Sequence, residues 1–211
     1  MPIEELKKFS FHELENLTPE CNSQELESSV VRYATFMSNT VAEMKRESGS
    51  DPESLCFWIS KVNDIMIRAW RVPKRGHEIG NTLCDVLRKN GGLDILIENC
   101  VVHHANLRFQ SAKLLQQCLV TANRGYVVEK GLDKVIEVAK NYTENISNNL
   151  EEVRVGTGIL EHLFKHSETT CSDVIAMGGL GKLQSTFITN KLVKYLSKGE
   201  PYYKMHPLEF A

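Results

Sequence analysis

A group of basic and imidazole side chains near position 165 has the residue types needed to bind an anion. His162 and Lys165 are three positions apart, and His166 follows directly. If residues 155–171 form one amphipathic helix, the apolar side chains share one face and His162 and Lys165 share the outer surface. Lysine is cationic, and an imidazole donates a hydrogen bond or gains charge near neutral pH. The pattern predicts a phosphate-binding site, although a plain solvated polar face fits it too.

Three further residues have the types that a nucleotide site needs. A flat aromatic ring such as Trp70 stacks on a base, an amide such as Gln117 binds ribose hydroxyls, and a cation such as Arg124 binds phosphate. Each also has an ordinary alternative role. Trp70 could cap an apolar core, and Arg124 could bind backbone carbonyls at the end of its helix.

Motifs of catalysis and metal binding are missing from the sequence. No glycine-rich phosphate loop, dinucleotide-binding motif, His-Glu-x-x-His or nucleophile elbow occurs. His103 and His104 are adjacent, so on a helix they point about 100° apart, with no carboxylate or thiol ligand beside them. Cys118 lies in an apolar run, where a buried, unreactive thiol is expected. We predict no catalytic residues and no metal site in this chain.

Composition narrows the class of protein. The 211 residues carry a net charge of −2, which gives no bulk electrostatic reason to expect nucleic acid or an anionic membrane as partner. Six cysteines without a Cys-x-x-Cys pair are typical of free thiols in a reducing compartment. With neither a signal sequence nor a long apolar run for a transmembrane segment, the sequence predicts a cytoplasmic protein.

Helical periodicity and internal similarity predict the fold. Apolar residues recur at helical spacing from Ser23, the expected N-cap, to about residue 46, and again over 52–72 and 77–89. Three similar segments are each expected to open a helix: Gly91-Gly-Leu-Asp, Lys130-Gly-Leu-Asp and Gly178-Gly-Leu-Gly. They begin helices 39 and 48 positions apart, and no strand pattern competes.

A second similarity relates the two candidate polar positions. Leu114-Leu-Gln-Gln-Cys-Leu119 matches Ile159-Leu-Glu-His-Leu-Phe164 at an offset of 45, which places Gln117 where His162 stands in the next repeat. Repeats of about 40 to 47 residues with helices in every unit indicate an all-α, armadillo/HEAT-type right-handed α-solenoid with a concave groove. We expect a loosely ordered segment over 1–24, the solenoid over 25–184, and a non-repeat helix and tail over 185–211.

Three segments of this chain resemble a known family. They are Trp70-Arg-Val-Pro-Lys-Arg-Gly76, Arg88-Lys-Asn-Gly-Gly-Leu-Asp-Ile-Leu96 and Gly158-Ile-Leu-Glu-His-Leu-Phe-Lys-His-Ser-Glu-Thr-Thr-Cys171. They are similar to the N-terminal armadillo region of the SARM family, the sterile alpha and Toll/interleukin-1 receptor motif-containing NAD+ hydrolases. The resemblance covers about residues 54–183 and implies a regulatory region that ends before the catalytic domain, as in a truncated isoform or fragment.

The resemblance also implies a ligand and partners. In the family, the armadillo region holds the Toll/interleukin-1 receptor domains inactive with NAD+ in its groove, and nicotinamide mononucleotide competes for that groove and activates. This control acts in axon degeneration and innate immune signalling, and it implies full-length SARM-type subunits or their Toll/interleukin-1 receptor domains as partners. The implied nucleotide-binding residues here are Trp70, His77, Gln116, Gln117, Leu119, Arg124, His162 and Lys165.

Two of these positions depart from the family pattern. His77 stands where arginine is usual, and Gln116 where glutamate is usual, so contacts to phosphate and ribose at these points are less certain. An armadillo scaffold that binds an extended peptide is the alternative function. Such a scaffold would carry a ladder of Asn and Trp along its groove, whereas the tryptophans here are only Trp58 and Trp70.

Overall fold

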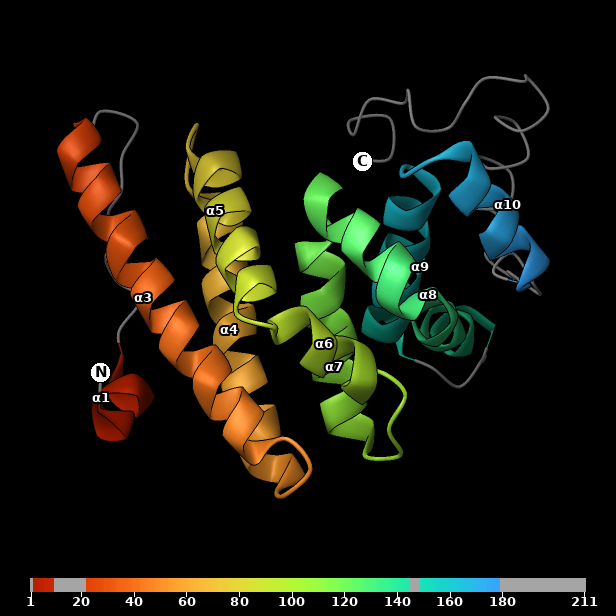
Figure 1. Cartoon of the computed structure of the whole chain (residues 1–211), viewed down its shortest axis with the longest axis horizontal. Coiled ribbons are helices and arrows are strands. Elements are labelled where there is room, and N and C mark those ends of the chain that lie inside the picture. Colours follow the sequence, from red (N-terminus) through yellow and green to blue (C-terminus); the bar gives the residue numbers. More distant parts are fainter. Residues whose placement is uncertain (1, 10–21, 145–148, 179–211) are drawn as a thin grey trace. The chain divides into compact units, whose positions relative to one another are not determined.

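The described part of the chain is built from helices. The computed structural model describes residues 2–9, 22–144 and 149–178, and within these ranges it contains helices and no strand (Figure 1). Within each of its two units successive helices pack against one another, and the all-α solenoid class is confirmed. The chain divides into two compact units, Met1–Val120 and Thr121–Ala211.

Unit 1 begins with a short helix and a long one, α1 (Ile3–Lys8) and α3 (Ser23–Glu47). Asn22, and not Ser23, is the N-cap of α3, because its side-chain oxygen accepts a hydrogen bond from the Glu25 backbone N–H at 2.9 Å. The Glu25 carboxylate in turn accepts from the Asn22 backbone N–H at 3.2 Å. This reciprocal capping box satisfies two N–H groups that the helix start leaves free, and it explains the one-residue error in the predicted cap.

The next two helices follow the predicted boundaries closely. Helix α4 (Pro52–Arg71) has proline in its first turn and ends at Val72, since the residue before Pro73 is disfavoured in helical conformation. Helix α5 (Gly76–Lys89) begins after a tight turn. A Cβ at Gly76 would lie 2.3 Å from the Trp70 carbonyl oxygen, so this close approach of the two helices requires glycine.

Helices α6 (Gly92–Asn99) and α7 (Ala105–Cys118) complete unit 1. Gly91 has a φ of 74°, a left-handed conformation that glycine adopts readily, and it separates α5 from α6. His104 caps α7, since its Nδ1 accepts from the Leu107 backbone N–H at 3.2 Å, and its Nε2 lies 2.9 Å from Glu53 in the first turn of α4. Because α7 starts beside the start of α4 and packs along it, their C-terminal ends lie at the same end of unit 1.

Unit 2 contains α8 (Thr121–Glu144), α9 (Leu150–Phe164) and α10 (Glu168–Ala176), with α9 packed against both others. The single helix predicted over 155–171 is wrong. Helix α9 stops at Phe164, Lys165 is its C-cap, and the Ser167 side chain caps α10 by accepting from the Thr170 backbone N–H at 3.1 Å. Ser167 lies within the apolar period over 155–171 and begins a new helix there. The helical spacing on which the predicted outer surface depended therefore does not continue through Lys165.

The repeat pattern is reflected in the core. The matched apolar positions of α7 and α9 are all buried to 0–1% exposure: Leu114, Leu115, Leu119, Ile159, Leu160 and Phe164. Gln117 and His162, at the corresponding polar position, are both half-buried. Gly131 interrupts α8 at the second predicted helix start, whereas the third, from Gly178, lies mostly outside the described residues. The division into 1–24, 25–184 and 185–211 stays a prediction, with 185–211 also outside them.

The described residues bear on two predictions, one about the cysteines and one about transmembrane helices. Cys56, Cys84, Cys100 and Cys118 are buried, and none of these four forms a disulfide. A side-chain hydrogen bond with Cys84, together with burial, raises the pKa of the Cys118 thiol well above its ordinary value, in agreement with an unreactive side chain. None of the described helices combines the length and the hydrophobicity that crossing a bilayer requires.

Candidate functional site

Unit 2 brings Arg124, His162 and Lys165 together although 38 positions separate the first two. Arg124 lies in the first turn of α8, and its Nη1 donates to the backbone oxygen of His162 at 3.4 Å. His162 lies in the last turn of α9, and Lys165 is the C-cap of the same helix. We call these three residues and Glu161 the unit 2 cationic cluster.

Lys165 is less exposed than the sequence predicted. Its side chain is 12% exposed and forms an ion pair with the Glu161 carboxylate, which lies one helical turn earlier. The expectation that Lys165 projects from the outer surface is therefore wrong, because the end of α9 folds its side chain back along the helix. An incoming anion must share or replace Glu161 as the partner of this ammonium group.

The pKa of His162 is lowered to about 4. Burial is the main cause, the nearby positive charges of Lys165 and Arg124 lower the pKa further, and Glu161 opposes them. Of the two roles expected for this imidazole, gain of charge near neutral pH is wrong, and donation of a hydrogen bond is the one that remains. A neutral His162 instead offers one N–H donor and one acceptor nitrogen at pH 7.

Arg124 has one side-chain donor without a partner. Its Nη2 donates to Thr121 Oγ1 at 3.0 Å, while its Nε is buried and forms no hydrogen bond. Burial also lowers the pKa of the guanidinium, which nevertheless stays charged at any physiological pH. The ordinary alternative, that Arg124 binds carbonyls at the end of its own helix, is wrong: Arg124 lies in the first turn of α8 and binds a carbonyl oxygen near the end of α9.

Trp70 lies in unit 1, in the last turn of α4, and its side chain is half-buried. The indole ring packs on the backbone of α5, where a Cβ at Gly80 would lie 2.4 Å from its Cε3. The exposed His77 ring lies against it edge-on, at 5.9 Å between ring centroids and 70° between planes. Trp70 therefore caps part of the core, as the alternative held, and keeps a portion of its side chain accessible.

Gln116, Gln117 and Leu119 lie at the C-terminal end of α7, at the same end of unit 1 as Trp70. Leu119 is 1% exposed, so its side chain supports the core and has no surface for a ligand. Gln116 and Gln117 are both half-buried. The Gln117 Nε2 donates to Asn63 Oδ1 at 2.7 Å, which leaves the Gln117 carbonyl oxygen as the group that could meet a ligand.

The structure therefore places the eight predicted residues in two groups. Trp70, His77, Gln116, Gln117 and Leu119 belong to unit 1, and Arg124, His162 and Lys165 belong to unit 2. Sequence reasoning missed three neighbours that control them. They are Asn63, the buried partner of Gln117; Glu161, the counter-ion of Lys165; and Gly80, which makes room for the indole. Only Asn63 carried a signal, an amide at an apolar position of α4.

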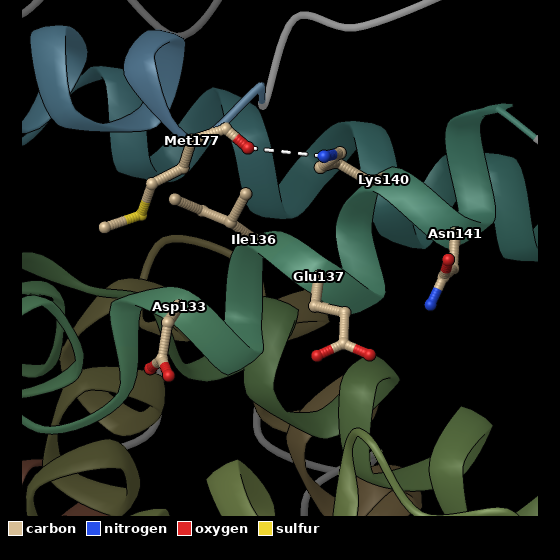
Figure 2. Close-up of a pocket in the computed structure, with 6 residues that line it drawn as sticks. All are labelled: Asp133, Ile136, Glu137, Lys140, Asn141 and Met177. Carbon is tan, nitrogen blue, oxygen red and sulfur yellow. Dashed lines mark hydrogen bonds between the residues drawn. The ribbon is translucent and has the colours of Figure 1, made fainter.

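A pocket of about 370 Å³ in unit 2 is lined by none of the predicted residues. Asp133, Glu137 and Lys140 of α8 line it together with Met177, whose backbone oxygen accepts from Lys140 Nζ at 3.2 Å (Figure 2). Within the described ranges, no three His, Cys, Asp or Glu side chains are grouped as a metal site would require. The pocket therefore gives no support to the predicted site.

Comparison with known proteins gives a consistent family. The chain is 45% identical over 183 residues to NAD(+) hydrolase sarm1 of Drosophila melanogaster, a match that covers 83% of this chain and 13% of that protein. It is 32% identical over 122 residues to NAD(+) hydrolase SARM1 of Danio rerio, covering 58% of this chain. Identity to NAD(+) hydrolase tir-1 of Caenorhabditis elegans is 24% over 166 residues. The last two matches each span 16% of the relative.

Comparisons with protein-family models and with solved structures say less about the family. No protein-family model matches the chain. The crystal structure of an engineered protein is similar with a TM-score of 0.53 and 12% sequence identity, covering 95% of this chain and 75% of that one. At this identity, the likeness shows the fold alone.

The fold and the cationic cluster define the class, an all-α solenoid segment with two half-buried cations at helix ends in unit 2. The relatives then give the family. Over the matched stretch the chain belongs to the SARM family of NAD(+) hydrolases, of which it represents a small part.

Proposed function

We propose that this chain is a regulatory, autoinhibitory armadillo region of a SARM-type NAD+ hydrolase that senses NAD+ and nicotinamide mononucleotide. The observation that supports it best is the unit 2 cationic cluster, in which two cations and a neutral imidazole are gathered at low exposure. Buried positive charge is costly unless it has a partner, and Glu161 balances only one of the two cations. An anionic ligand would supply the remaining negative charge.

A phosphate group suits the donors of this cluster. It would accept hydrogen bonds from the Arg124 guanidinium, from Lys165 and from an N–H of the neutral His162. Each charge-assisted hydrogen bond contributes about 1.5 to 3 kcal/mol, so two of them would supply about 3 to 6 kcal/mol of the binding free energy of a nucleotide, and the rest must come from its other groups.

Within unit 1, the residues that the family resemblance implies are proposed to contact a nicotinamide nucleotide. The accessible portion of Trp70 would stack on the nicotinamide ring, and His77 at its edge would take the place of the arginine usual in the family. Gln116 and Gln117 would contact ribose or carboxamide groups, while the buried Leu119 would contribute by supporting the end of α7.

Opposite effects of two nucleotides at one site follow from linkage. A ligand shifts an active/inactive equilibrium only by its differential affinity for the two states. NAD+ and nicotinamide mononucleotide share the nicotinamide, ribose and phosphate groups and differ in size, so they can favour different states. The partners would be full-length SARM-type subunits or their Toll/interleukin-1 receptor domains in the cytoplasm, and the processes would be axon degeneration and innate immune signalling.

Calorimetric titration of the 211-residue chain with each nucleotide tests the proposal. We expect Lys165→Ala to weaken binding of nicotinamide mononucleotide by about tenfold or more, because a charge-assisted hydrogen bond is lost. Trp70→Ala is expected to weaken it comparably through lost stacking, without the change in salt dependence that Lys165→Ala causes.

Arg154→Ala is the matched control, since Arg154 is an exposed cation on the same helix as His162. Its removal changes the net charge as Lys165→Ala does, and it should leave the affinity within about twofold. A measured affinity that Lys165→Ala, His162→Ala and Trp70→Ala all leave unchanged would place the ligand elsewhere and refute the proposal.

A further inference from the structure

A buried amide joins α4 to α7 in unit 1. Asn63 lies on the apolar face of α4 and is 2% exposed. Its Nδ2 donates to the backbone oxygen and to the side-chain Oε1 of Gln110, both at 3.0 Å. Its Oδ1 accepts from Gln117 Nε2 at 2.7 Å. These three hydrogen bonds use both Asn63 N–H groups and its oxygen, as a buried amide requires.

The chemistry of the partners fixes the direction of each amide. Side-chain oxygen and nitrogen of Asn and Gln are otherwise easily exchanged. A backbone oxygen can only accept, so the Asn63 Nδ2 must face Gln110. The Asn63 oxygen must then face Gln117, and the Gln117 Nε2 must point inward to donate to it.

The Gln117 carbonyl oxygen is left pointing away from this network. No described residue donates a hydrogen bond to this oxygen. It is not one of the buried side-chain atoms left without a partner, so it has accessible surface. Gln117 is half-buried, so its nitrogen is held inside while its oxygen reaches the surface at the end of α7. A freely rotating glutamine would present either end equally.

We propose that Asn63 is a positioning residue that fixes Gln117 as a hydrogen-bond acceptor, so that this position takes a hydroxyl or amide N–H of the ligand and disfavours an oxyanion. The inference rests on the proposed function, in that the ligand is taken to be a nicotinamide nucleotide. The groups it selects in such a ligand are a ribose hydroxyl or the carboxamide nitrogen.

The test compares nicotinamide mononucleotide with three analogues that each lack one donor. They are the 2′-deoxy and 3′-deoxy forms and nicotinic acid mononucleotide, and binding of each to the 211-residue chain is measured by calorimetry. We expect one analogue to bind about five- to tenfold more weakly than the parent, as loss of one hydrogen bond predicts. In Gln117→Met, which has a similar shape and no acceptor oxygen, the same analogue and the parent should bind equally.

Two variants of Asn63 separate positioning from general stability. Asn63→Leu removes the partner of Gln117 and should reduce the discrimination to about twofold, because the freed amide can rotate. Asn63→Asp keeps an oxygen that accepts from Gln117, so it should retain the discrimination. Unfolding midpoints, measured together with the affinities, show whether each variant is folded. If Asn63 had only a structural role, Asn63→Leu and Asn63→Asp would discriminate between the analogue and the parent nucleotide to the same extent.

Hydrogen exchange of the Gln117 side-chain amide, followed by NMR on the free chain, requires no ligand. We expect slow exchange in the parent chain and fast exchange in Asn63→Leu. If the parent binds the nucleotide but every analogue binds equally well, or if the Gln117 amide exchanges fast, the inference is overturned while the proposed function stands. If no nucleotide binds at all, the proposed function fails, and the exchange rates still decide whether Asn63 orients Gln117.

Discussion

His162 shows how a tertiary environment changes the chemistry of a single residue. The free imidazole titrates near 6.5, whereas burial and two neighbouring cations lower the pKa of His162 to about 4. At pH 7 this side chain is therefore neutral in the folded chain. Its contribution to phosphate binding is a hydrogen bond and not a charge.

The lowered pKa predicts a pH dependence of stability. Between pH 6.5 and 4, His162 is protonated in the unfolded chain and neutral in the folded chain. Its contribution to the free energy of unfolding is therefore fully present above about pH 6.5 and is lost as the pH falls. From pH 7 to pH 5 we expect the free energy of unfolding to fall by about 2 kcal/mol because of this residue. Urea unfolding at both pH values measures it, and His162→Gln should remove most of the difference. An unchanged difference would show that other groups cause it.

Glu161 is predicted to compete with the ligand. Its carboxylate holds the Lys165 ammonium in an ion pair at low exposure. In Glu161→Gln the ammonium is free to bind phosphate, so we expect affinity for nicotinamide mononucleotide to rise about three- to tenfold. Glu137→Gln, an exposed carboxylate on α8, is the control for net charge. A fall in affinity for Glu161→Gln alone would mean that Glu161 positions Lys165 for the ligand.

At the scale of elements, the ends of helices carry the candidate residues. Trp70, Gln117 and His162 lie in last turns, Lys165 is a C-cap, and Arg124 lies in a first turn. Backbone groups are unsatisfied at helix ends, and side chains there have neighbours from the following helix. Small changes in how two helices meet should therefore alter the site more than changes in mid-helix.

Gly80 is the position where this expectation can be tested. A Cβ there would lie 2.4 Å and 2.5 Å from two atoms of the Trp70 ring, so Gly80→Ala must displace the indole. We expect a loss of about 1 to 3 kcal/mol in unfolding free energy and weaker nucleotide binding. Chemical denaturation and calorimetry measure the two effects.

Gly125→Ala is the matched control for Gly80→Ala. Its Cβ would meet only His166 Cε1, at 3.6 Å, which is ordinary van der Waals contact. Alanine favours the helix over glycine by up to about 1 kcal/mol, so this variant should be neutral or more stable. Equal stability changes for both variants would contradict the close packing of Trp70 on α5.

At the scale of the whole molecule, the chain represents a small part of its relatives. It spans 13% of the Drosophila protein and 16% of the other two. A regulatory role predicts that the purified chain releases no nicotinamide from NAD+, because the proposed site binds the nucleotide without cleaving it. Chromatographic assay of nicotinamide measures this. Release that Lys165→Ala leaves unchanged would reveal a catalytic site elsewhere in the chain.

The sequence by itself determined the helical class, most helix boundaries and the family. Periodicity, Pro52, Pro73 and Gly91 act locally, through backbone conformation and the spacing of apolar side chains, so they can be read without knowing distant neighbours. The repeat offset of 45 could also be found from the sequence alone. It correctly matched the buried residues of α7 with those of α9.

Only the tertiary structure decided how the candidate residues behave. The pairing of Lys165 with Glu161, the neutral state of His162 and the inward direction of the Gln117 nitrogen depend on which side chains burial brings together. The break at Ser167 shows the same limit, since an apolar period can continue across the point where one helix ends and another begins. Burial and charge act through space, and residue spacing along the chain does not record them.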